Sequence, residues 1–162
     1  WPLIACLNGH AIGGGALLAT LCDLRIARPG LRFQIPASRI GIMYPLEGFR
    51  RLVGLLGSGR AAELLLGGGP VDTARGLGWG LYNEVVEDPE ARALALAAEL
   101  AERAPLAIQG MKRMLSALED RLPDVDIEAL HASITEACAT STDLAEGIAA
   151  TAERRRPRFE GR

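Results

Sequence analysis

The sequence predicts an α/β fold followed by a helical C-terminal region, and three observations carry this prediction. Short apolar runs bounded by turn residues occupy the first 34 positions, which predicts short strands. Three consecutive glycines, at 13–15, follow the first of these runs and precede a run of helix-forming residues. From residue 45 onward, helix-forming segments alternate with glycine and proline, so this part is expected to be mostly helical.

Turn residues mark the ends of the strands and the helix predicted over residues 2–34. The run PLIACLNG (2–9) ends at Asn-Gly and predicts a buried strand that stops at a turn. The segment GGALLATLC (14–22) has few polar residues, so it predicts a short helix that is almost fully buried. The segments DLRIAR (23–28) and LRFQ (31–34) flank a Pro-Gly pair and predict two short strands around a turn.

The rest of the chain is expected to be irregular over 35–48 and then mostly helical. The clearest helix spans 88–105, because Asp88 stands at the N-cap, Pro89 at the first helical position and Pro105 beyond the end. Further helices are predicted over 45–57, 57–69, from 73, near 105–118, near 125–140 and near 142–156, with a strand at 82–86.

Composition and charge limit the possible function classes. A chain of 162 residues is long enough for one domain with a hydrophobic core. Hydrophobic residues make up 49% and charged residues 23%, which excludes a disordered chain and leaves surplus apolar surface that suits an oligomer. A formal net charge of −2 gives no overall attraction to nucleic acid or to an anionic membrane.

The cysteines and the apolar runs indicate a cytoplasmic location. Cys6, Cys22 and Cys138 are an odd number without a C-x-x-C pair, so neither a disulfide framework nor a zinc site is expected. No run approaches the roughly 20 apolar residues of a membrane span, and the first residues lack the basic segment of a signal peptide.

The glycine run points to a ligand oxygen, because free N–H groups at a helix start form an anion or carbonyl-oxygen site. The spacing does not fit a phosphate P-loop, a dinucleotide fingerprint or a nucleophile elbow. A purely structural alternative stays open, in which the glycines only let the helix pack tightly on the preceding strand.

Three stretches of the sequence resemble a known family. The N-terminal WPLIACLNGHAIGGGALLATLCDLRIA is similar to the P-x-I-A-x-x-N-G-x-A-x-G-G-G signature of the enoyl-CoA hydratase/isomerase, or crotonase, superfamily. The resemblance continues over 33–86 and ends in AEGIAATAERRRPRFEGR, which looks like the closing segment of that family. It therefore implies a crotonase-like ββα superhelix, incomplete at its N-terminus, over 1–87, and a helical region for oligomerisation and coenzyme A (CoA) binding over 88–162.

The resemblance implies a role for the glycine run. In the family, the amide of the glycine matching Gly14 donates to the thioester oxygen of an acyl-CoA, where an enolate develops. A preset amide there stabilises the transition state by about 3–4 kcal/mol. Gly13 and Gly15 are expected to provide clearance, so Gly13 counts among the substrate-binding residues.

Family hydratases carry two glutamates, and both matching positions differ in this chain. The positions are Leu17 and Ala37, which we expect to line the substrate site without acid–base function. Glu47 stands two residues beyond the position of the isomerase acid, and we expect it to act as a possible acid/base. The alternative is a carboxylate that stabilises the first turn of a helix. Tyr44 is a further substrate-binding candidate.

The resemblance also places the last helix near the CoA phosphates, which makes Arg155, Arg156 and Phe159 candidates for CoA binding. The alternatives are solvated arginines at a helix C-terminus and, least favoured, nucleic-acid binding through 154–158.

The expected activity is isomerisation or another enolate step on an acyl-CoA thioester rather than hydration. A non-catalytic acyl-CoA-binding homologue or an assembly subunit is the alternative. We expect CoA to enter only as part of the substrate, with no separate cofactor and no metal. The expected assembly is a trimer or a dimer of trimers. The family length implies that the chain is either part of a longer protein or a subunit that completes its site with another chain.

Overall fold

The computed structural model describes residues 1–120 and 126–162, with the side chains of 119 and 120 left undescribed. The chain forms two compact units, one of Leu3–Ala95 and one of Trp1–Pro2 with Leu96–Arg162. The described part combines one parallel and one mixed sheet with helices, as the sequence predicts for an α/β fold with a helical C-terminal region.

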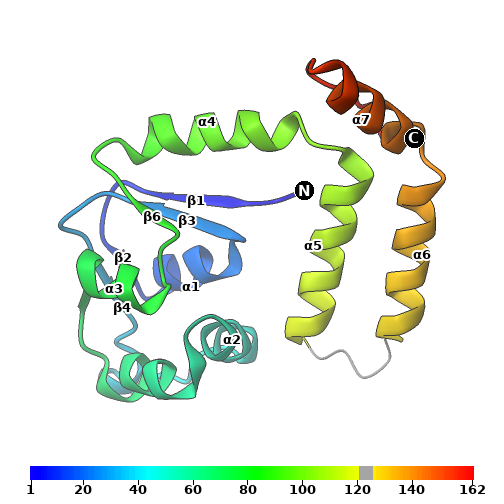
Figure 1. Cartoon of the computed structure of the whole chain (residues 1–162). Coiled ribbons are helices and arrows are strands. Elements are labelled where there is room, and N and C mark those ends of the chain that lie inside the picture. The colour runs from blue at the N-terminus through cyan, green and yellow to red at the C-terminus, as the bar shows by residue number, and fades with distance from the viewer. Residues whose placement is uncertain (121–125) are drawn as a thin grey trace. The chain divides into compact units, whose positions relative to one another are not determined.

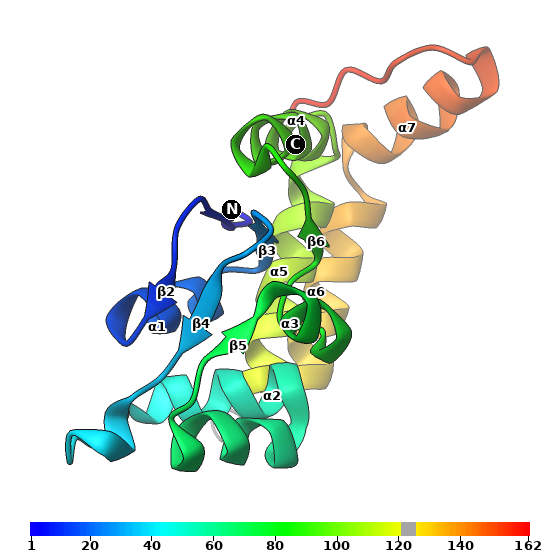
Figure 2. The same ribbon diagram turned by 90° about the vertical axis from the view of Figure 1, so that its left-hand side faces the viewer.

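The unit Leu3–Ala95 contains two three-stranded sheets. The first has the order β1-β3-β6 and is parallel throughout, with Leu7 paired with Ala27. The second has the order β2-β4-β5, in which β2 is parallel and β5 antiparallel to β4, as Figure 2 shows. The strands are β1 (Ile4–Leu7), β2 (Ala11–Ile12), β3 (Leu24–Ala27), β4 (Arg32–Gln34), β5 (Val71–Asp72) and β6 (Glu84–Val85).

The two strands predicted around Pro29-Gly30 exist, but they do not pair with each other. β3 pairs with β1 and β6, whereas β4 pairs with β2 and β5, so the Pro-Gly turn carries the chain from one sheet to the other. The sequence missed β2 and β5, because two-residue strands are too short to show alternation.

A glycine breaks the longest helix of this unit. The helix predicted from 45 to 57 and the one from 57 to 69 form α2 (Leu46–Ala62), broken at Gly57 with φ 75°. A π-helical turn, η2 (Glu63–Gly67), continues it. The other helical elements of the unit are α1 (Gly14–Leu21), the 3-10 helix η1 (Ala37–Arg39) and α3 (Thr73–Trp79).

The core lies between the strands and one face each of α1 and α2, with Phe33, Ile35 and Leu52 fully buried. Of α1, only Ala16, Ala19 and Thr20 are buried. The prediction of an almost fully buried helix over 14–22 is therefore wrong, since Leu18 is 67% exposed. An apolar composition could not show that only one face of α1 packs within this unit.

Side-chain caps mark the starts of α4 (Pro89–Ala101) and α7 (Thr142–Glu153). Asp88 accepts a hydrogen bond from the Ala91 amide (2.9 Å), which confirms the cap predicted for α4. Ser141 accepts one from the Leu144 amide (3.2 Å) at α7. Between them, α5 (Pro105–Asp120) and α6 (Ile127–Ala139) run side by side in Figure 1; residue 125, the predicted start of α6, lies outside the described residues.

Residues 154–162 form a tail that two carboxylates fasten to α7. Both oxygens of the buried Asp143 accept main-chain hydrogen bonds, from the Glu160 amide (2.7 Å) and the Gly161 amide (2.9 Å). Glu146 accepts one from the Arg158 amide (2.7 Å). The tail is therefore fixed by charge-assisted hydrogen bonds to main-chain groups.

The attachment of the tail is expected to depend on pH through Glu146. The hydrogen bonds from Arg155 and from the Arg158 amide lower the pKa of this carboxyl to about 2. Because this pKa lies below the value of about 4.3 for a free glutamate, the stabilisation is complete above that value and is lost as the pH falls toward 2. We expect hydrogen exchange at the Arg158 amide to accelerate over this range, beyond the intrinsic pH dependence of exchange. In Glu146→Gln this extra acceleration is expected to vanish; a variant that keeps it would contradict the prediction.

No helix in the described ranges is long and apolar enough to cross a membrane.

Candidate functional site

The glycine run forms the turn between β2 and α1. Gly13 has φ 57° and ψ −116°, a conformation that side chains with a Cβ rarely adopt. Its amide donates to the Gln34 carbonyl (2.9 Å), and its carbonyl accepts from the Leu17 amide (3.0 Å). The backbone conformation at Gly13 thus favours glycine, and it lets this residue bond to β4 through its amide and to the first turn of α1 through its carbonyl.

Gly14 and Gly15 are the first two residues of α1, so their N–H groups have no acceptor within the helix. Both are exposed, and a Cβ added at either would meet no atom of the described chain within 4 Å. Close packing of the helix on the strand therefore does not explain these two glycines. Their amides lie at the positive end of the helix dipole, which suits an incoming oxygen.

A pocket of about 300 Å³ opens beside this turn. The sequence did not indicate its other walls, which come from β1, the following loop and the outer side of α1. Its lining consists of Ala5, Cys6, Leu7, Asn8, Gly9, His10, Ala11, Gly15, Leu18, Ala19 and Cys22. Burial, and then the charges of Glu90 and Asp88, raise the pKa of the Cys6 thiol, so this group stays protonated near neutral pH.

Leu17 and Ala37 are half-buried and pack against the same hydrophobic core. Leu17 lies on α1, one turn beyond Gly14, and Ala37 begins η1. Leu17 also lies close to α2, because a Cβ added to Gly48 would be 3.0 Å from its Cδ1. Neither side chain offers a group that can hold a proton.

Tyr44 lies in the core rather than on an open wall. It is 8% exposed, its ring meets that of Phe49 edge-on with centroids 6.3 Å apart, and its Cε1 contacts the position that a Cβ of Gly48 would take. Its hydroxyl is buried and has no hydrogen-bond partner among the described residues. Burial raises the pKa of Tyr44 to about 12, so the phenol is neutral at physiological pH.

Replacing Tyr44 by phenylalanine is expected to leave the free energy of unfolding unchanged or to raise it by up to about 1 kcal/mol, because a buried hydroxyl without a partner is lost. Chemical denaturation measures this change. Tyr82→Phe is the matched control, since its hydroxyl is also buried without a described partner. A loss above about 1 kcal/mol for Tyr44→Phe alone would show that its hydroxyl is bonded.

Glu47 is exposed in the first turn of α2. A carboxylate at this position is favoured by the helix dipole, which is the structural alternative for this residue. Glu47 and Gly14 both belong to the unit Leu3–Ala95. The acid–base role of Glu47 stays a prediction.

The basic residues predicted to bind CoA lie in the other unit and are engaged with carboxylates. Arg155 forms two hydrogen bonds to Glu146, at 2.5 and 2.9 Å, and one to Glu153 at 2.6 Å. These contacts raise the pKa of Arg155. Arg156 pairs with Glu102 at 2.9 Å. A phosphate would have to compete with these carboxylates, and the CoA-binding role stays a prediction.

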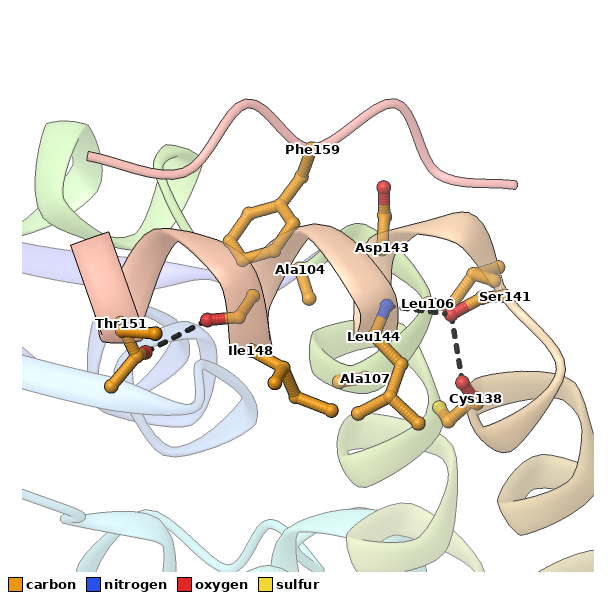
Figure 3. A pocket seen from close by; sticks show the side chains of 12 residues that line it. Ala104, Leu106, Ala107, Cys138, Ser141, Asp143, Leu144, Ile148, Thr151 and Phe159 are labelled. Carbon is orange, nitrogen blue, oxygen red and sulfur yellow. Dashed lines mark hydrogen bonds between the residues drawn. The ribbon is translucent and has the colours of Figure 1, made fainter. Parts of the chain in front are cut away.

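Phe159 covers an open, largely apolar pocket of about 590 Å³ between the tail, α5, α6 and α7 (Figure 3). Its ring contacts the space next to Gly147, where an added Cβ would lie 3.5 Å from Cε1. In Figure 3 the ring points from the tail toward α7, above Ile148. The aromatic side chain therefore anchors the tail in addition to any role toward a ligand.

Within the ranges that the structure describes, no group of three or more histidine, cysteine or acidic side chains is placed to hold a metal ion.

Comparison with known proteins identifies the family of this chain. A family model described as enoyl-CoA hydratase/isomerase matches residues 1–162. The probable enoyl-CoA hydratase echA6 of Mycobacterium tuberculosis is 37% identical over 99% of this chain and 64% of its own length. The 2,3-dehydroadipyl-CoA hydratase of Escherichia coli is 34% identical over the same shares of the two chains.

The fold agrees as well. The crystal structure of an enoyl-CoA hydratase from Mycobacterium tuberculosis H37Rv superposes with a TM-score of 0.91 at 35% identity, covering 99% of this chain and 64% of that one. The chain thus spans 64% of the length of these two curated relatives. A family model that covers all 162 residues and a shared fold together establish that the chain belongs to the enoyl-CoA hydratase/isomerase family, with a crotonase-like fold.

Proposed function

We propose that this protein binds an acyl-CoA thioester and stabilises its enolate through the main-chain amide of Gly14. The observation that carries the proposal is the start of α1, where the exposed Gly14 is the first helical residue and a Cβ at its position would meet no described atom within 4 Å. An enolate places negative charge on the thioester oxygen, and a preset N–H donor stabilises that charge. The names of two relatives, an enoyl-CoA and a dehydroadipyl-CoA hydratase, support the substrate class.

The chemistry is expected to be isomerisation rather than hydration. Hydration needs one group to deprotonate the water and one to handle the proton at C2, and Leu17 and Ala37 supply neither. Isomerisation of a 3-enoyl thioester needs one base, which removes a proton from C2 and returns it at C4 while the double bond moves to C2–C3. Glu47 is our candidate for this base, and no cofactor takes part.

A second candidate function is binding without turnover. The apolar side chains at 17 and 37 and the exposed position of Glu47 favour a non-catalytic acyl-CoA-binding homologue or assembly subunit. In either case we expect a homo-oligomer, a trimer or a dimer of trimers, with Arg155, Arg156 and Phe159 near the CoA.

A pair of substrates separates these functions. Incubated with a 3-enoyl-CoA, the full chain is expected to form the 2-enoyl isomer, and Glu47→Gln is expected to lower that rate by about 10²-fold or more. With a 2-enoyl-CoA, hydration is expected to be negligible. Hydration at the rate of an ordinary hydratase would contradict the assignment of positions 17 and 37. Measurable binding of both thioesters without turnover would establish the second function.

A further inference from the structure

Two arginines hold the end of α1 opposite to Gly14. Arg25, on β3, is 4% exposed. Its Nη1 donates to the carbonyls of Cys22 (2.6 Å) and Ala19 (3.4 Å), and its Nε donates to that of Leu81 (2.7 Å). The buried guanidinium of Arg25 thus donates hydrogen bonds to main-chain carbonyls at the C-terminal end of α1.

Arg51 reaches the same helix end from α2. Its Nε donates to the Thr20 carbonyl and its Nη2 to the Leu21 carbonyl, each at 3.3 Å. The four consecutive carbonyls of residues 19–22 therefore all accept from a guanidinium. The last carbonyls of a helix have no partner within it, and here two cations satisfy them.

The two like charges gather there at an electrostatic cost. Burial, and then the charge of Arg51, lower the pKa of Arg25. The Arg25 guanidinium nevertheless keeps its charge, because the pKa of arginine starts above 12. The negative charge of Asp23, beside the same helix end, acts on Arg25 in the opposite direction. A helix C-terminus carries about half a negative charge, so the two cations still exceed the sum of this charge and that of Asp23.

We propose that Arg51, together with Arg25, is a positioning residue for the amide of Gly14. The pair fixes α1 at its C-terminal end and offsets the negative end of its dipole, so that the potential at the N-terminal amide becomes more positive. The eight residues of α1 span about 12 Å, a distance over which a charge in a partly buried site still acts. This inference rests on the proposed enolate function. It names the two arginines as the source of part of the positive potential at the Gly14 amide.

The test uses the full chain and crotonyl-CoA carrying ¹³C at the thioester carbonyl. Binding to the wild type is expected to lower the infrared stretching frequency of that carbonyl, because the Gly14 amide polarises it. In Arg51→Met we expect at least half of this decrease to be lost, while Arg51→Lys keeps most of it. The dissociation constant is expected to change less than about threefold, and kcat for a 3-enoyl-CoA to fall by about three- to tenfold.

Arg50→Met is the matched control, since Arg50 is exposed on the same helix and its loss removes the same charge. A wild-type complex without any frequency decrease would overturn the proposed function and this inference with it. A normal decrease that is equal in the wild type, Arg51→Met and Arg50→Met would overturn the inference alone. Equal losses in Arg51→Lys and Arg51→Met would also overturn it, because a charge-conserving variant that fails points to packing.

Discussion

Replacing Gly14 by proline is expected to lower kcat on an acyl-CoA thioester by about 10²–10³-fold, the effect of losing one oxyanion donor. Proline has no N–H, and position 14 is the first helical residue of α1, where proline is well tolerated. The fold is therefore expected to survive while the donor disappears. Steady-state kinetics measure the loss, with circular dichroism to verify the helix content.

Gly14→Ala is the matched control for this variant. It keeps the amide, and a Cβ at position 14 meets nothing within 4 Å in the described chain. We expect its kcat to stay within about tenfold of the wild type. If the alanine and proline variants lose activity equally, the side-chain volume at 14 matters and the amide does not.

Replacing Asp143 by alanine is expected to release the C-terminal tail from α7. The buried carboxylate accepts the amides of Glu160 and Gly161, and without it both amides lose a charged partner. The local opening free energy of these amides is expected to fall by about 2–4 kcal/mol. Hydrogen exchange followed by mass spectrometry or NMR measures this change at the two residues.

Asp143→Asn keeps one acceptor oxygen, so about half of that loss is expected. Glu153→Gln serves as a surface control, because its salt bridge with Arg155 is exposed and is expected to contribute little to stability. Unchanged exchange at Glu160 and Gly161 in Asp143→Ala would show that the other contacts, from Glu146 and Phe159, are sufficient to anchor the tail.

The sequence was sufficient for elements that carry their own boundary signals. Asp88 and Pro89 marked the start of α4, and the glycine at 57 marked the break inside α2. Strand pairing could not be predicted from the sequence, because β3 and β4 are close in sequence but belong to different sheets. Local residues specify a turn, whereas the partner of a strand depends on distant segments.

In the candidate site, too, features with a local sequence signal were predicted and features that depend on distant residues were not. The glycine run predicted the open helix start, since its signal is local. The arginines at the other end of α1 lie 26 positions apart and had no local signal, although a basic residue soon after a helix end is a known capping pattern. Tyr44 was predicted to bind substrate, and its burial against Phe49 arises from packing that no short motif encodes.

The contact of Leu17 and Tyr44 with the same glycine, Gly48, has a consequence for protein engineering. Hydration is expected to require carboxylates at both 17 and 37, and the present side chain at 17 packs against the core. A charge there would enter an apolar neighbourhood before it could serve any chemistry. An acid at 17 therefore needs a hydrogen-bond donor introduced beside it, because a charge among apolar side chains is costly without a partner.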